Sequence, residues 1–206
     1  MEKKDVVVDT TPKVDVLVEK KGPNKTSFIA IVAVFAALDA ILGIFAVIIP
    51  SPIPGISGFY PAIAFETAVA IWLGGFGGLM VSVLACLVAY TVLGSWNIFG
   101  ILTFISIPPI ILIPWAFRKF NIDPSLTSAK GYAVFFGFSL IREVISGIAG
   151  SYGTLAMGWI PPEMFWISVV TWVVADMIVL ATIGVVLLKL VTKYMKMFNL
   201  YVPGAW

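Results

Sequence analysis

The sequence has 206 residues, of which 60% are hydrophobic and 12% are charged. Soluble domains carry about 25% charged residues, so a soluble globule of this composition would lack the polar surface needed to cover it. The chain has no histidine and one cysteine, Cys86, which excludes a disulfide framework, imidazole-ligated metals and Ser-His or Cys-His catalysis. We therefore expect an all-α integral membrane protein that is not an enzyme and has no cofactor, no metal and no nucleic-acid partner.

The first 26 residues differ in composition from the rest of the chain. They contain six lysines and five acids, and they close with Gly22-Pro23-Asn24. We predict a flexible charged tail over residues 1–26, with Ser27 at the start of the first helix. The apolar stretch that follows Lys25 is too long for the apolar part of a signal peptide.

Lys and Arg are absent from Ser27 to Phe117. A helix needs about 20 apolar residues to cross the hydrocarbon core of a bilayer. Divided at its glycine- and proline-rich turns, the chain predicts a bundle of six transmembrane helices at residues 28–49, 61–74, 78–93, 97–117, 132–148 and 164–190. Pro108, Pro109 and Pro114 are expected to kink the fourth helix. The transmembrane domain is then 27–190, and 191–206 is a short C-terminal tail.

The basic residues support this arrangement. All except Arg142 lie in the first 25 residues, in the loop with Arg118, Lys119 and Lys130, or at the end with Lys189, Lys193 and Lys196. The positive-inside rule places such segments in the cytoplasm. Six helices with both termini cytoplasmic meet this rule, because the predicted outer loops 50–60, 94–96 and 150–163 contain no basic residue. No clear polar gap separates the second and third helices. We count them as two because only then do all the basic segments fall on the cytoplasmic side.

Aromatic residues fall at the ends of the predicted helices, as two interfacial belts require. The outer set is Phe59, Tyr60, Trp96, Tyr152, Trp159 and Trp166, and the inner set is Trp72, Trp115, Tyr132 and Tyr194. We expect a multi-pass protein of the cell membrane, with the lipid bilayer around it.

Ionisable residues inside the spans carry the functional argument; they are Asp39, Glu66, Arg142, Glu143 and Asp176. Each costs about 2.5–3.5 kcal/mol or more at the bilayer centre, so each should face protein or a water-filled cavity. One interpretation is internal pairing, with Arg142 bridging one or two acids. The other is a site for a small polar ligand. Pairing leaves three acids to be protonated or matched by a cation, which favours a cationic or hydrogen-bond-donating ligand, or a proton-coupled carboxylate.

Polar and small residues recur at helical spacing on the last two predicted helices. One stripe is Ser139, Arg142, Glu143, Ser146, Gly147 and Gly150, and the other is Ser168, Trp172 and Asp176. Such stripes can also simply hold helices together. We predict ligand contacts from Glu66, Arg142, Glu143, Trp172 and Asp176, in a cavity that opens outward. Its mouth would be closed by Tyr60, Trp96, Tyr152 and Trp159.

The first predicted helix carries a stripe of small residues that includes Ala33-xxx-Ala37 and Ala36-xxx-Ala40. Small residues let membrane helices approach closely, either inside the bundle or against a partner subunit. With six spans, about 200 residues and the run Leu73-Gly74-Gly75-Phe76-Gly77-Gly78, the chain resembles the substrate-binding S-components of energy-coupling-factor (ECF) vitamin transporters. The resemblance implies that the outer ends of the helices enclose a micronutrient. It also implies that Ala33, Ala36, Ala37 and Ala40 dock on a coupling membrane subunit of an ATP-driven complex.

A second resemblance covers the last 80 residues. Its residues are Pro124-Ser125-Leu126-Thr127-Ser128, Phe165-Trp166 and Thr171-Trp172-Val173-Val174-Ala175-Asp176. They are similar to the MASE-type membrane sensor domain, whose last helix has an "FW…tWwlgDalG" pattern with an acid at the place of Asp176. Met177-Ile178-Val179 departs from the glycine-containing continuation of that pattern. Because the chain ends at Trp206, a sensor of this kind would need a separate kinase or cyclase partner.

The chain contains no Walker motif, so we expect no ATPase activity in it. The sequence favours a substrate-binding subunit that captures a small polar micronutrient from the outside and delivers it through an ATP-driven partner complex. The alternative is a stand-alone sensor domain that signals through a separate partner. A membrane assembly protein is a third possibility.

Overall fold

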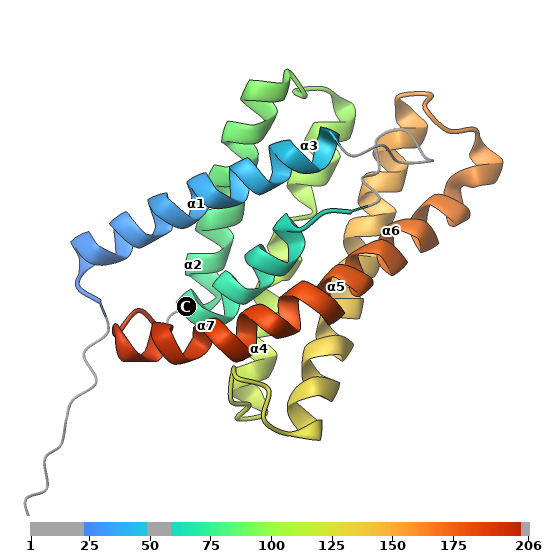
Figure 1. Cartoon of the computed structure of the whole chain (residues 1–206). Coiled ribbons are helices and arrows are strands. Elements are labelled where there is room, and N and C mark those ends of the chain that lie inside the picture. The colour runs from blue at the N-terminus through green and yellow to red at the C-terminus, as the bar shows by residue number, and fades with distance from the viewer. Residues whose placement is uncertain (1–22, 49–58, 203–206) are drawn as a thin grey trace, which may run out of the picture.

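The computed structural model describes residues 23–48 and 59–202 (Figure 1). Over these residues the chain is helical and has no strand. The helices are α1 (Lys25–Ile48), α2 (Ala62–Leu93), α3 (Ile98–Ile105), α4 (Leu112–Lys119), α5 (Ala129–Ala156), α6 (Phe165–Val179) and α7 (Val185–Met197). Two 3-10 turns, η1 (Pro108–Ile111) and η2 (Pro162–Met164), and one π-helical stretch, η3 (Leu180–Gly184), complete the order. Residues 1–22 of the predicted tail 1–26 and residues 50–58 of the predicted outer loop 50–60 lie outside the described residues.

Five helical stretches of the described chain are long and apolar enough to cross a membrane: Lys25–Val47, Ala62–Leu93, Ile98–Lys119, Ala129–Ala156 and Pro162–Met197. Large apolar side chains along them are exposed, including Phe45, Val92, Trp166 and Leu190 at 62–67% of their full accessible area. Soluble monomers do not leave apolar surface of this extent uncovered. The all-α prediction is confirmed, and the chain is a multi-pass membrane protein.

Helix α2 is broken at Gly74. This residue has φ 80° and ψ 175°, a conformation open to glycine but not to residues with a Cβ. A methyl group added at Gly78 would lie 2.5 Å from Cα of Ala70. In a straight helix these two positions would be about 12 Å apart. The chain therefore doubles back at Gly74, inside the glycine run, and α2 consists of two helices, 62–73 and 75–93.

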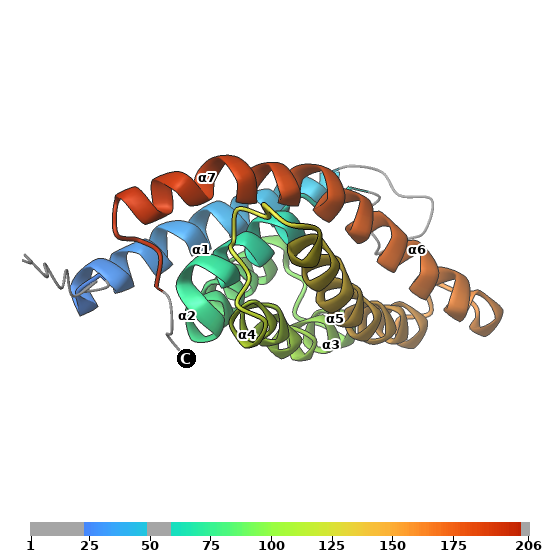
Figure 2. The same ribbon diagram turned by 90° about the horizontal axis from the view of Figure 1, so that it is seen from below.

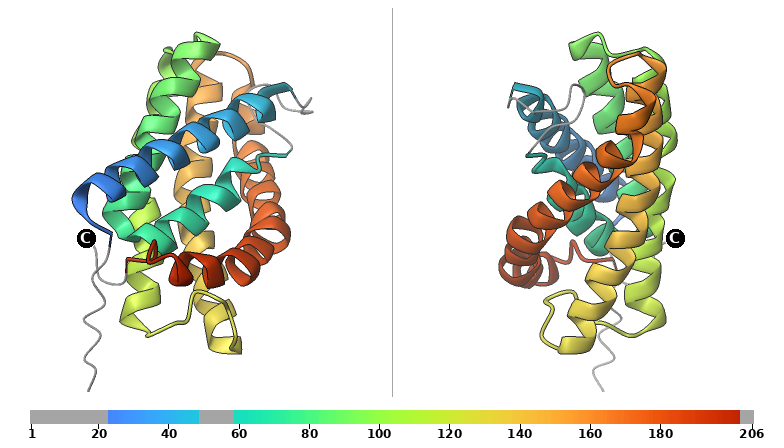
Figure 3. Two further views of the ribbon diagram at one scale, coloured as in Figure 1. Left: turned by 60° about the vertical axis from the view of Figure 1, so that its left-hand side comes forward. Right: turned by 90° about the vertical axis from the view of Figure 1, so that its right-hand side faces the viewer.

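Contacts between distant segments define one end of the molecule. The Phe28 ring lies 3.3 Å from where a methyl group at Gly77 would be. The amide of Val202 donates to the carbonyl of Trp72 at 2.9 Å, and Lys196 Nζ lies 3.0 Å from Asp123 Oδ2. The start of α1, the break in α2, the loop after α4 and the end of α7 therefore meet at this end (Figures 1 and 3).

The helices form two crossing layers (Figures 2 and 3). In one layer, α1 and α7 flank residues 62–73. The other layer contains residues 75–93, α3, α4 and α5. Every residue from 62 to 75 is buried except Phe65, which is half-buried. This short helix is therefore buried on all sides and forms the centre of the bundle.

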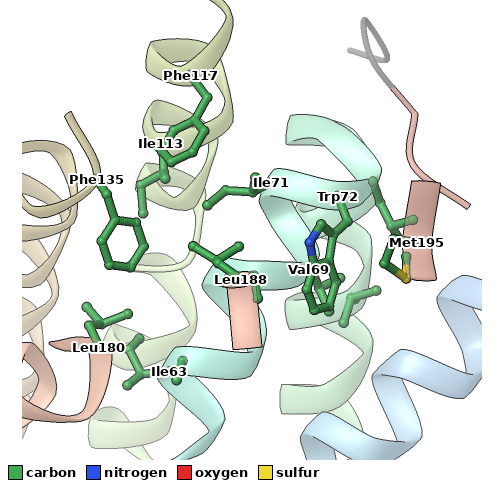
Figure 4. Close-up of a cluster of buried hydrophobic side chains, with 14 of the residues drawn as sticks. Ile63, Val69, Ile71, Trp72, Ile113, Phe117, Phe135, Leu180, Leu188 and Met195 are labelled. Atoms are coloured by element: carbon green, nitrogen blue, oxygen red, sulfur yellow. The ribbon is translucent and has the colours of Figure 1, made fainter. Parts of the chain in front are cut away.

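The apolar core surrounds that central helix. Figure 4 shows Ile63, Val69, Ile71 and Trp72 packed with side chains from the other helices: Ile113, Phe117, Phe135, Leu180, Leu188 and Met195. The prediction that Trp72 belongs to an interfacial belt is wrong, since its side chain is 1% exposed. Its indole Nε1 donates to Thr192 Oγ1 at 2.9 Å. Because the indole N–H has this partner inside the bundle, Trp72 does not need to lie at the membrane interface to be hydrogen-bonded.

Helix ends differ from the predictions in several places. Asn24, not Ser27, caps α1, because its Oδ1 accepts from the Ser27 amide at 2.8 Å. The predicted fourth helix is two helices separated by the 3-10 turn at Pro108, and Pro114 lies in the first turn of α4, where proline is tolerated. Helix α5 continues to Ala156 and the last helix to Met197.

Candidate functional site

Arg142 joins two acids in the interior of the bundle. Its Nη2 lies 2.7 Å from Glu66 Oε2 and its Nη1 lies 2.8 Å from Glu143 Oε1. The three residues are between 0% and 5% exposed. Glu66 belongs to the central helix, whereas Arg142 and Glu143 belong to the buried face of α5. The pairing interpretation describes these two contacts correctly, and the question is whether pairing accounts for the remaining polar atoms.

Asp176 extends this cluster to α6. Its side chain is buried, and Glu143, Arg142 and Glu66 are the charged groups that act on it electrostatically. Asp176 therefore adds a third buried acid to the two that pair with Arg142.

Asp39 approaches the cluster from α1. It is 2% exposed, and neither of its carboxylate oxygens has a hydrogen-bond partner in the described part of the chain. Glu66 and Arg142 are the charged groups that act on it electrostatically. A buried carboxylate without a partner is costly, so Asp39 is the member of the cluster that pairing leaves unexplained.

Further buried polar atoms of the same helices are unused. Arg142 Nε, Glu143 Oε2 and the hydroxyls of Thr67, Ser82 and Ser139 make no hydrogen bond with described residues. Buried polar atoms in proteins are nearly always satisfied, and each exception requires an explanation. Thr67 follows Glu66, and Ser139 precedes Arg142 by about one helical turn. The sequence identified Asp39 as a buried acid but assigned it no ligand contact, and it gave no signal for Thr67 or Ser82.

Tyr60 lies on the α1 side of the cluster. Its hydroxyl is 3.5 Å from where a methyl group at Gly43 would be. Asp39, Glu66, Cys86 and Tyr90 are the groups that act on it electrostatically. The structure therefore brings Tyr60 into the neighbourhood of the predicted ligand contacts.

Trp172 is one helical turn from Asp176 on α6, but its ring packs against α5. A methyl group at Gly150 would lie 2.5 Å from its Cζ3, and the ring also packs with Ile160. The glycine of the α5 stripe thus makes room for Trp172. Nearby, the hydroxyls of Ser151 and Ser168 are 2.8 Å apart, so part of both stripes holds the two helices together.

The three other aromatic residues predicted to close a mouth lie at the surface. Trp96, Tyr152 and Trp159 are 37–58% exposed. Their ring partners differ: Tyr90 for Trp96, Phe165 for Tyr152 and Phe99 for Trp159. These contacts neither confirm nor contradict a shared mouth, and the role of the three residues in closing it stays a prediction.

The alanine stripe of α1 is divided between two environments. Ala36 and Ala40 are buried against the bundle, whereas Ala33 and Ala37 are exposed. At 3.6 residues per turn, the four residues spread over about 100° of the helix circumference, and the edge of the buried face of α1 falls inside this arc. Only Ala33 and Ala37 remain available to a partner.

Comparison with protein-family models, with curated proteins and with solved structures finds no match to this chain.

Proposed function

We propose that this protein is a membrane-embedded substrate-binding subunit that captures a small polar micronutrient from the outside and delivers it through an ATP-driven partner complex. The observation that carries the proposal is the buried cluster centred on Arg142. Ionisable groups inside a membrane protein are expensive, and they commonly mark a substrate or ion pathway. This cluster holds more polar atoms than pair with one another, as expected of a site that a polar solute completes.

The proposed topology is six spans in the cell membrane with both termini in the cytoplasm. The doubling back of the chain at Gly74 supports counting 62–73 and 75–93 as two spans. Residues 62–73 measure about 18 Å at 1.5 Å per residue, which is short for a span, but they are covered by protein and need no contact with lipid. The end where α1 starts and α7 ends carries the basic residues, which supports a cytoplasmic position for it.

The exposed residues Ala33 and Ala37 support docking of α1 on a coupling membrane subunit. A small side chain lets a partner helix approach the backbone closely. The neighbouring positions Val34 and Leu38 are also exposed and would add apolar contact along one side of the strip. The partner surface proposed here is this strip, without Ala36 and Ala40.

Affinity purification from native membranes in mild detergent tests the assignment. The preparation should contain an ATPase, a coupling membrane subunit and a small polar solute that mass spectrometry identifies after denaturation. A preparation with a bound solute but with a signalling kinase or cyclase as its only companion would contradict the transport role.

One observation favours the alternative, a sensor domain. The π-helical stretch η3 begins four residues after Asp176 and leads directly into α7. Such stretches are frequent at functional sites and mark places where a helix can change register. Ligand binding at the cluster could then move α7, and the kinase or cyclase outcome above would support this function.

A further inference from the structure

Asp39 differs from Glu66 and Glu143 in having no partner. Glu66 and Glu143 each direct one oxygen to the Arg142 guanidinium. Both oxygens of Asp39 are buried without any hydrogen bond to described residues. Glu66 and Arg142 act on it electrostatically, so we include it in the proposed site, on the α1 side.

The charge balance of the cluster is uneven. Arg142 supplies the only positive charge among the five buried ionisable residues Asp39, Glu66, Arg142, Glu143 and Asp176. That charge is engaged by Glu66 and Glu143 at 2.7 and 2.8 Å. Asp39 still lacks a positive partner.

Protonation of Asp39 alone would leave its carboxyl group without hydrogen-bond partners. A protonated carboxyl group is a hydrogen-bond donor as well as an acceptor, and no described protein group lies in position to bond either oxygen. A buried donor without an acceptor is itself destabilising. A cation that also donates hydrogen bonds satisfies both oxygens at once.

We propose that the buried, unpartnered carboxylate of Asp39 receives the positively charged nitrogen of the solute, so that the substrate class is a small organic cation with an ammonium or guanidinium group. The inference rests on the function proposed above and specifies its ligand. Within the described residues no group of three or more Cys, Asp and Glu is arranged to hold a metal ion, which favours a nitrogen cation that needs only one or two carboxylates. The unused Arg142 Nε and the hydroxyls of Thr67 and Ser139 would bond the polar uncharged part of the solute.

The test is a binding panel on the purified full chain, read by thermal unfolding in detergent. Cationic probes are methylammonium, putrescine, guanidinium and choline, and their uncharged counterparts are methanol, 1,4-butanediol, urea and 3,3-dimethylbutanol. At least one cation should raise the unfolding temperature in a saturable way, and its counterpart should not. Asp39→Asn retains the shape of the side chain and removes its charge. It should lower the affinity for that cation by about 10- to 100-fold, as expected for the loss of a charge-assisted hydrogen bond.

Asp123→Asn is the matched control, because it is the same substitution at an exposed acid in the loop after α4. It should bind the cation as tightly as wild type. Binding of a cation that Asp39→Asn leaves unchanged would overturn the inference. So would a protein that carries a neutral or anionic solute from its native membranes, although the proposed function would survive that result. A protein that binds no solute of any charge would overturn both.

Discussion

At the scale of single residues, Arg142 is the group on which the buried cluster depends. It pairs with both Glu66 and Glu143 through two short contacts. The sequence offered pairing of Arg142 with one or two acids as one of two interpretations, because ionisable groups inside apolar helices need protein or water around them. It could not predict that Asp39 would be left out, since that depends on the angle at which α1 crosses the bundle.

Arg142→Ala should destabilise the protein by about 3–5 kcal/mol, because it leaves buried acids without their counter-charge. It should also abolish solute binding. Unfolding followed by thermal melting in detergent checks the first effect. Arg142→Lys retains the charge but loses the two-pronged geometry, so it should fall between wild type and Arg142→Ala. An alanine variant with full stability and normal binding would contradict the assignment.

Asp123 provides a prediction on pH outside the spans. Burial opposes ionisation of its carboxyl group, but bonds from the Ser125 amide and side chain and from Lys196 outweigh it, so its pKa is lowered. The folded state therefore gains stability from Asp123 above the ordinary pKa of aspartate and loses it as the pH falls through the lowered value. The gain is below about 1 kcal/mol, because the pair with Lys196 is exposed to solvent.

Asp123→Asn should thus melt slightly below wild type at neutral pH. The difference should vanish at a pH below the lowered pKa. Melting curves of both proteins across this range provide the check. A constant difference at every pH would show that the ion pair is not its cause.

At the scale of elements, the break at Gly74 fixes the position of the central helix and hence of Glu66. Gly74→Ala places a side chain at φ 80°, ψ 175°, so it should destabilise the fold by about 1–3 kcal/mol. Gly137→Ala is the control: no heavy atom lies within 4 Å of the added methyl group, and it should be neutral or slightly stabilising. Thermal melting distinguishes the two. Equal stability of Gly74→Ala and wild type would mean that the turn is not held by this residue.

The lengths of the helices were the least predictable feature at this scale. Glycines in the chain read as helix ends, and the predicted fifth helix therefore stopped before Gly150. In the structure Trp172 and Phe99 occupy the space beside Gly150 and Gly153, so these glycines serve packing inside α5. A glycine that makes room for a neighbour inside a helix and a glycine that forms a turn, such as Gly74, can be told apart only from their tertiary contacts.

At the scale of the whole molecule, the all-helical membrane class could be predicted from composition and hydropathy alone. The two crossing layers could not, because they depend on how 62–73 inserts between α1 and α7. The same geometry divides the alanine stripe. It makes Ala37 a surface residue and Ala40 a core residue, and so gives a test of partner docking with an internal control.

Ala37→Leu should block assembly with a membrane partner and leave folding and solute binding intact, because the added bulk lies on the exposed face of α1. Ala40→Leu should instead destabilise the isolated chain by about 1–3 kcal/mol through overpacking. Co-purification of partners and thermal melting measure the two effects. Normal assembly of Ala37→Leu would remove α1 from the proposed partner surface.

The claim that the Arg142 cluster binds a solute is tested most directly by native mass spectrometry of wild type and Glu66→Gln, both purified gently from native cells. Glu66→Gln retains the side-chain shape and removes one of the two charges that face Arg142. Thermal melting of the same samples shows that the variant is folded. We predict that wild type carries the added mass of a small polar solute and that the variant has lost it. Wild type without added mass, or equal occupancy in both proteins, would contradict the account.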